Sequence, residues 1–139
     1  MYLGLGSNLG AKEVNIRKAI QLIGERVGQV TRCSSFIETE PWGFDSDNRF
    51  LNAVVRCETR LTPRQVLRTT QQIERDMGRM HKSVAAGQEP RVVYHDRPID
   101  IDILLYDDLT VDEPGLKIPH PLMQQRDFVM VPLREIYDS

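Results

Sequence analysis

The 139-residue sequence predicts an α+β fold in which an antiparallel sheet carries helices on one face. Apolar residues occupy every second position from Ile99 to Leu105, which is the period of a strand, and they recur every three or four positions from Ile16 to Val27, which is the period of a helix. The predicted elements follow the order strand, helix, strand, strand, helix, strand, which is typical of a ferredoxin-like split βαβ sandwich. Since no repeat or change of composition divides the chain, we expect one domain over residues 1–139.

The first half of the chain should hold three strands and one helix. A glycine-containing turn after the first strand matches neither of the common phosphate-binding glycine motifs, so we interpret it as structural. Ser7 or Asn8 is expected to cap the helix, and Gly28 to end it. The expected elements are a strand at 2–6, a helix ending before Gly28, a strand at 30–40, a loop at 41–48 and a strand at 50–59, paired antiparallel with the one before it.

The second half opens with a strong helix start. Thr62, Pro63 and Gln65 provide an N-cap, a proline at the first helical position and the partner of a capping box. This helix should bury Val66, Ile73 and Met77 and end near Gly78. A loop without hydrophobic period follows over residues 79–98, then the strand around Asp100, and finally a tail with an apolar stretch at 128–133.

Composition excludes several function classes. The formal net charge of −2 gives no reason to expect binding to nucleic acid or to an anionic membrane. No run of 18 apolar residues predicts a membrane span, and no signal-peptide pattern begins the chain. Cys33 and Cys57 lack a Cys/His cluster, so they indicate a reducing compartment rather than a metal site. We therefore expect a cytoplasmic protein.

Two carboxylates on the last predicted strand are the most informative feature. Asp100 and Asp102 share the strand face opposite Ile99, Ile101 and Ile103. Neighbouring carboxylates repel unless a proton or a cation lies between them. A pair of oxygen ligands suits Mg²⁺, which keeps waters and takes phosphates as its other ligands. A strand face in water is the alternative, but the apolar surroundings and the preceding Arg97 favour a metal–phosphate site.

Arginines and aromatic residues suggest how a phosphorylated substrate is bound. Arg79 and Arg97 flank the long loop, where guanidinium groups can oppose charge on a transferring phosphoryl group; the alternative is a solvated, charged loop. Asn52, with Phe50 and Trp42 nearby, offers donors, an acceptor and rings for a planar heterocycle, although a strand-end amide beside core aromatics is the simpler interpretation.

Four further residues have weaker signals. His120 lies between two prolines and is typical of a rigid turn, but with Arg126 nearby it is also a candidate for phosphate contact. Gln71 and Glu74 on the second helix would ordinarily be assigned to its solvent face.

Six motifs, taken in their order along nearly the whole chain, form a combination more specific than any one of them. They are Leu5–Leu9, Glu40-Pro41 with Gly43, Phe50–Val54, Ile73-Glu74 with Gly78-Arg79, Arg97 with Asp100–Ile103, and Pro119-His120 with Arg126 and Phe128. In this combination the chain resembles the 6-hydroxymethyl-7,8-dihydropterin pyrophosphokinase family of folate biosynthesis.

The resemblance implies transfer of the pyrophosphoryl group of ATP to the hydroxymethyl oxygen of the pterin, with release of AMP. It also implies the ferredoxin-like fold, a monomer, small-molecule substrates only and two Mg²⁺ ions. The roles implied are metal ligands for Asp100 and Asp102, phosphate contacts for Arg79 and Arg97, ATP contacts for Gln71, Glu74, His120 and Arg126, and a pterin pocket of Thr39, Glu40, Trp42, Phe50, Asn52 and Phe128.

The chain departs from the family pattern in three places. The loop at 80–96 is longer than in compact members and carries Tyr94 where a tryptophan is common, while Gly115 and Pro121 replace an arginine and an aromatic residue near the nucleotide. Lys117 is a candidate to compensate for the lost nucleotide contacts. Two other function classes compete with the pyrophosphokinase: a magnesium-dependent nucleotide phosphohydrolase and a non-catalytic module that binds pterin or nucleotide.

Overall fold

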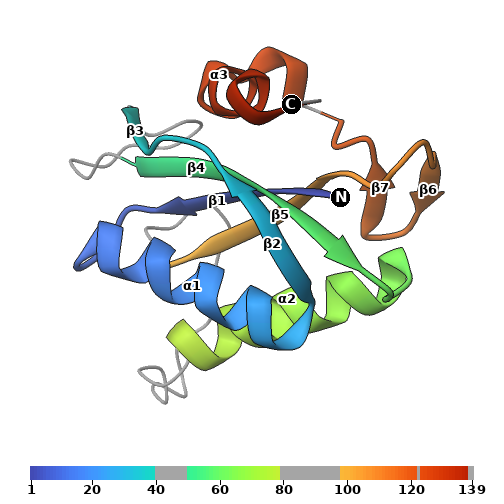
Figure 1. Ribbon diagram of the computed structural model, residues 1–139, viewed down its shortest axis with the longest axis horizontal. Coiled ribbons are helices and arrows are strands. Elements are labelled where there is room, and N and C mark those ends of the chain that lie inside the picture. Colours follow the sequence, from blue (N-terminus) through green and yellow to red (C-terminus); the bar gives the residue numbers. More distant parts are fainter. Residues whose placement is uncertain (40–49, 79–97, 122, 138–139) are drawn as a thin grey trace.

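The structure is a computed structural model that describes residues 1–39, 50–78, 98–121 and 123–137 (Figure 1). Its main sheet is antiparallel with the strand order β2-β4-β1-β5, and β3 pairs with the same edge of β4 as β2 does. The strands are β1 (Tyr2–Ser7), β2 (Gly28–Cys33), β3 (Ile37–Thr39), β4 (Phe50–Thr59) and β5 (Asp100–Leu105). The predicted α+β class and antiparallel sheet are confirmed.

Two helices cover one face of this sheet, as Figure 1 shows, and they are α1 (Lys12–Arg26) and α2 (Pro63–Gly78). Their apolar stripes, including Ile16 and Ile73, form a core with Leu3 and Leu5 of β1. Every one of these four side chains is at most 3 % exposed. Burial of this apolar surface is the main force that holds the helices to the sheet.

A third helix, α3 (Asp127–Ile136), lies over the opposite face (Figure 1). Val129 and Leu133 of this helix pack with Val54 of β4 and Leu104 of β5 in a second, smaller core. The sequence showed this segment only as an apolar stretch. The apolar side of this helix packs on the sheet and explains the apolar stretch.

The connection from β1 to α1 differs from the expectation. The N-cap is Ala11, without a side-chain bond, in place of the expected Ser7 or Asn8. Asn15 of the helix holds the preceding turn, since its Nδ2 donates to the Leu9 carbonyl at 2.9 Å and to Ser7 Oγ at 3.3 Å. The strand itself continues to Ser7, and the turn contains Gly10 with a φ of 73°.

Gly28 was expected to end α1 but is the first residue of β2. The helix is capped by Val27, whose N–H bonds to the Ile23 carbonyl. A Cβ at Gly28 would lie 2.1 Å from the carbonyl oxygen of Glu58 on β4. The glycine is therefore explained by the close approach of two backbones at the start of a strand.

The expected long strand at 30–40 is interrupted. Ser34 N–H donates to the Val54 carbonyl at 2.9 Å, but Val54 N–H donates in return to Ser34 Oγ, also at 2.9 Å. A side-chain oxygen thus replaces a backbone carbonyl in the ladder. Pairing resumes with β3, where Ile37 lies opposite Asn52.

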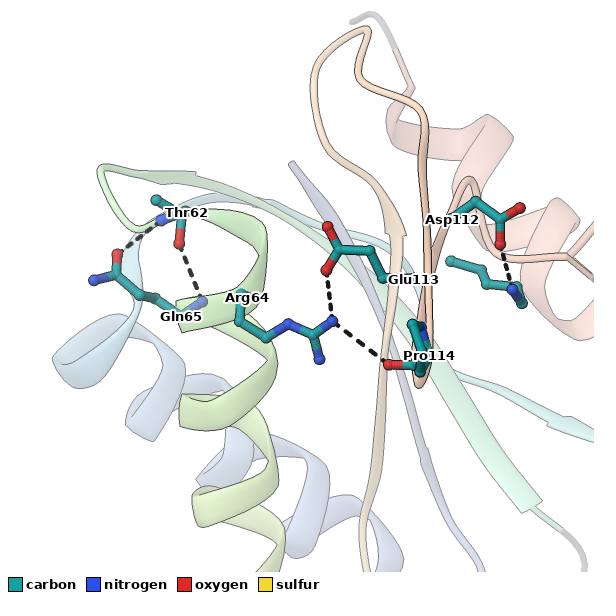
Figure 2. A network of polar contacts seen from close by, with 7 residues as sticks. Thr62, Arg64, Gln65, Asp112, Glu113 and Pro114 are labelled. Carbon is teal, nitrogen blue, oxygen red and sulfur yellow. Dashed lines mark hydrogen bonds and ion pairs between the residues drawn. The ribbon is translucent and has the colours of Figure 1, made fainter.

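The start of α2 is confirmed in detail. Thr62 N–H donates to Gln65 Oε1 at 2.9 Å, and Gln65 N–H donates to Thr62 Oγ1 at 3.2 Å, which is the reciprocal capping box (Figure 2). The helix ends at Gly78, as predicted. In the tail, β6 (Val111–Glu113) and β7 (Leu116–Ile118) form a hairpin that turns at Pro114-Gly115, with Gly115 at a φ of 78°.

Within the described residues, no helix has both the length and the apolar character needed to cross a membrane.

Candidate active site

β5 places two carboxylates on the sheet face that α3 only partly covers. Ile101 and Ile103 of this strand, with Ile99 just before it, are at most 6 % exposed and belong to the core beneath α1 and α2. Asp100 and Asp102 are half-buried and, by the alternation of the strand, project from the other face. The predicted pairing of the two aspartates on one face is therefore present.

The donor set fits magnesium. Among the described residues, no group of three or more His, Cys, Asp and Glu side chains forms a metal site that the protein could complete alone. Two half-buried carboxylates instead leave most coordination positions to water and to phosphate oxygens, which is how Mg²⁺ is usually bound together with a nucleotide.

The sheet register aligns these aspartates with Asn52 of β4. Gly6 of the central strand β1 lies opposite Asn52 on one side and opposite Asp100 on the other. Gly4, in the next row, lies opposite Asp102. Since neighbouring strands are about 4.8 Å apart, the Cα atoms of Asn52 and Asp100 are separated by roughly 10 Å. Asn52 itself is 5 % exposed.

Phe50 and Thr39 pair with each other in the row next to Asn52, on the strands away from the aspartates. β3 pairs with β4 so that Ile37 is opposite Asn52 and Thr39 is opposite Phe50. Phe50 is half-buried, and its ring and the Asn52 amide both border Gly6. Three of the residues expected for the heterocycle are thus neighbours in the sheet, although the side chain of Thr39 is not among the described atoms.

Glu74 of α2 is bound to the strand that carries the aspartates. Its Oε2 accepts a hydrogen bond of 2.7 Å from the backbone N–H of Ile101, the residue between Asp100 and Asp102. Among the described strands β5 lies at the edge of the sheet, so this N–H points away from β1 and meets the helix. The contact fixes the distance between α2 and the strand at the candidate metal site.

A cavity of about 300 Å³ lies between α2, β5 and the β6–β7 hairpin. Asp102 and His120 contribute its polar lining, together with Lys117. Lys117 also forms an ion pair with Asp112 across the hairpin. Gly115 and Pro121, two of the three places where the sequence was expected to depart from the family pattern, line the same cavity.

The wall of this cavity is held by Arg64 from the first turn of α2. Its Nη2 is 2.6 Å from Glu113 Oε1 and 3.5 Å from the Pro114 carbonyl oxygen, so the helix is tied to the turn of the hairpin (Figure 2). Sequence reasoning missed this pair because the two partners lie 49 positions apart and neither stands in a recognisable motif.

His120 and Arg126 complete the described part of the site. His120 N–H bonds to the Leu104 carbonyl at 3.1 Å, which joins the segment after β7 to β5. Burial lowers the pKa of the His120 imidazole, the Arg126 guanidinium lowers it further, and the Asp100 carboxylate acts in the opposite direction. Together these effects lower the pKa of His120 and favour a neutral imidazole.

Gln71 is an exposed residue of the α2 stripe that also contains Leu67 and Glu74. Leu67 lines the cavity and Glu74 bonds to β5, so Gln71 stands between two residues that face the site. Six other expected site residues have side chains outside the described part of the structure, and their roles stay predictions. They are Thr39, Glu40, Trp42, Arg79, Arg97 and Phe128.

Gly6 lies inside β1, as the expected strand at 2–6 implied, but it also faces the site, which was not foreseen from the sequence. A signal for this was present in the sequence. Leu3 and Leu5 alternate with Gly4 and Gly6, so the two glycines had to share the face opposite the core.

Comparison with known proteins identifies the family. Residues 2–138 match the family model described as 7,8-dihydro-6-hydroxymethylpterin-pyrophosphokinase (HPPK). The chain is similar to the 2-amino-4-hydroxy-6-hydroxymethyldihydropteridine pyrophosphokinase of Porphyromonas gingivalis, with 49 % identity over 98 % of this chain and 89 % of the relative.

Proteins of the same name from Aquifex aeolicus and Bacillus subtilis are each 38 % identical to it. The matches cover 98 % of this chain and 79 % of the Aquifex protein, and 97 % of this chain and 76 % of the Bacillus protein. With a family match over almost every residue, and with the asparagine and the paired aspartates aligned across one sheet face, the chain belongs to the 7,8-dihydro-6-hydroxymethylpterin-pyrophosphokinase family.

Proposed function

We propose that this protein transfers the pyrophosphoryl group of ATP to 6-hydroxymethyl-7,8-dihydropterin on the sheet face that carries Asn52, Asp100 and Asp102. The single observation that carries this placement is the register of three neighbouring strands, which aligns Asn52, Gly6 and Asp100 in one row. Asn52 would bind the heterocycle, and Asp100 and Asp102 would bind the metal. The separation between them is one that a single bicyclic substrate can span.

The pterin end of the row would be formed by Asn52 and Phe50. An asparagine amide has two donors and an acceptor, which matches the mixed donor and acceptor edge of a pterin. An aromatic ring beside it adds a face for stacking. The expected contributions of Thr39, Glu40, Trp42 and Phe128 would enclose the same end.

The phosphate end would be formed by Asp100 and Asp102, which would hold two Mg²⁺ ions between the protein and ATP. When bound, these ions would neutralise phosphate charge and lower the pKa of the attacking alcohol. Glu74 would keep β5 in place through Ile101, and the neighbouring Arg126 would add positive charge near the phosphates.

The nucleotide base and ribose would occupy the 300 Å³ cavity beside the aspartates. The cavity borders Asp102, so a nucleotide placed in it extends its phosphates toward the metal ligands. Lys117 and His120 line the cavity and would supply polar contacts in place of those lost at Gly115 and Pro121. Arg79 and Arg97, at the two ends of the long loop, would bind the phosphates.

The reaction is then a displacement at the β-phosphorus of ATP. The hydroxymethyl oxygen of the pterin forms a bond to this phosphorus, and the bond from the phosphorus to the oxygen that bridges the α and β phosphates breaks. AMP leaves with that oxygen and its electron pair, and the hydroxyl proton is released to water. The protein contributes mainly by positioning the two substrates and by opposing the charge of the phosphates.

The test is to incubate the protein with ATP, Mg²⁺ and 6-hydroxymethyl-7,8-dihydropterin and to measure AMP. AMP should form only when the pterin is present. Phosphate release from ATP without pterin would instead indicate a phosphohydrolase, and nucleotide binding without any product would indicate a binding module. Either result would overturn the proposal.

Asp102→Asn tests the metal site in the same assay. It should lower the rate by roughly 100-fold or more, because a neutral amide replaces a magnesium ligand. Asp108→Asn is the matched control, since it makes the same chemical change at an exposed position beyond the end of β5. Equal rates in the two variants would contradict the role of Asp102.

We also propose that residues 1–139 act as one pyrophosphokinase domain and as a monomer in the cytoplasm. Cys33 and Cys57 are both free thiols, which is typical of a reducing compartment. Sedimentation at micromolar protein concentration measures the mass of the protein in solution and tests whether it is a monomer.

A further inference from the structure

A side chain at position 6 would crowd the amide of Asn52. An ideal Cβ built on Gly6 lies 3.1 Å from Asn52 Oδ1 and 3.4 Å from Cδ1 of the Phe50 ring. The first distance is shorter than an ordinary carbon–oxygen contact, so the amide would have to move by a few tenths of an ångström. The second is an ordinary van der Waals contact.

The backbone does not require glycine at this position. Among the described residues, the glycines with positive φ are Gly10 and Gly115, so Gly6 has a conformation that alanine adopts without strain. Within a strand, glycine is less favourable than alanine unless another group approaches closely. Here the approaching group is the Asn52 amide, on the face that carries the aspartates.

We propose that Gly6 is a positioning residue for pterin recognition and acts through Asn52. By lacking a side chain, it lets the Asn52 amide lie over the β1 backbone at the position from which it reads the edge of the heterocycle. This inference rests on the proposed function of Asn52 and concerns specificity for the pterin, not for ATP.

Gly4 provides the contrast within the same strand. It has the same alternation and lies on the same face, two residues earlier. A Cβ there would meet the Leu104 methyl groups at 3.4 Å, which is an ordinary contact with the end of a flexible apolar side chain. Alanine at position 4 should therefore be accommodated, whereas alanine at position 6 should displace a hydrogen-bonding group.

The experiment compares Gly6→Ala with Gly4→Ala in steady-state kinetics for both substrates. Gly6→Ala should raise the KM for the pterin about tenfold or more, because a small misplacement of a recognition group is costly. Its KM for ATP should stay within twofold of the wild-type value. Gly4→Ala should leave both values within twofold.

A double-mutant cycle then tests whether Gly6 acts through Asn52. In an Asn52→Ala background the close contact is gone, so adding Gly6→Ala should raise the pterin KM no further. An unchanged pterin KM in Gly6→Ala, or the same tenfold penalty in both backgrounds, would overturn the inference.

Folding of the variants gives a separate outcome. If Gly6→Ala fails to fold while Gly6→Ala/Asn52→Ala folds, the predicted conflict with the amide is supported. If neither folds, Gly6 serves general packing and the inference is wrong. Failure of the proposed function would look different, because the wild-type protein would then form no AMP with the pterin.

Discussion

Replacing Glu74 by alanine removes the carboxylate that accepts the Ile101 N–H at 2.7 Å. Hydrogen bonds to charged groups contribute about 1.5–3 kcal/mol to stability. Since Glu74 is half-buried, solvent screens this contact, and we expect a loss near 1–2 kcal/mol in the free energy of unfolding. Glu74→Gln keeps a neutral acceptor and should lose about half as much.

Urea unfolding measures this change. With an m-value near 2 kcal/mol/M, the midpoint of Glu74→Ala should fall by about 0.5–1 M. Amide hydrogen exchange at Ile101 should become faster, because the edge N–H of β5 loses its acceptor. Since Ile101 lies between the two aspartates, the KM for ATP with Mg²⁺ should also rise in Glu74→Ala. The rise should be smaller in Glu74→Gln.

Asp76→Ala is the matched control for Glu74→Ala. It removes a carboxylate from the same helix, but Asp76 is exposed and pairs with Arg26 of α1 at 2.6 Å. This variant should be less destabilised and should leave exchange at Ile101 unchanged. If Glu74→Ala and Asp76→Ala behave alike at Ile101, or if Glu74→Gln is as impaired as Glu74→Ala, the contact does not position the strand.

Three further predictions concern other contacts. Arg64→Ala should raise the KM for ATP about two- to fivefold and leave the pterin KM unchanged, because it frees the cavity wall at Glu113; equal effects on both substrates would contradict this. Thr62→Ala should cost about 1 kcal/mol in urea unfolding through loss of the α2 cap, and no loss would refute its capping role. Ser35 lowers the pKa of Glu135 through two hydrogen bonds. These bonds therefore stabilise the fold above the unfolded pKa near 4.5, and this stabilisation is lost as the pH falls through the lower pKa of the folded state. The Tm deficit of Glu135→Gln should therefore shrink on acidification and be absent below that range.

Local sequence signals predicted elements whose causes are themselves local. The capping box of Thr62 and Gln65 located the start of α2, and strand periodicity located β4 over Phe50–Thr59. Contacts from distant residues changed the rest. Gly28 begins a strand because Glu58 approaches its backbone, and Ser34 interrupts a strand because its hydroxyl bonds to Val54.

The candidate site residues could be predicted from the sequence because their signals are also local. Alternation along one strand is enough to place Asp100 and Asp102 on a common face, and the order of motifs identified the family. Alternation does not say which residue of another strand lies alongside, since that depends on register. The partner of Glu74 was hidden as well, because a backbone N–H carries no sequence signature.

The sequence by itself determined which residues are candidates for the site, because side-chain type and strand or helix period are local properties. Only the tertiary structure decided how these residues are combined. The pairing of β4, β1 and β5 set Asn52 and Asp100 on either side of a glycine, and the packing of α2 brought Glu74 to the edge of β5. Both arrangements come from burying apolar faces between segments far apart in the chain, and their geometry is fixed only when those faces meet.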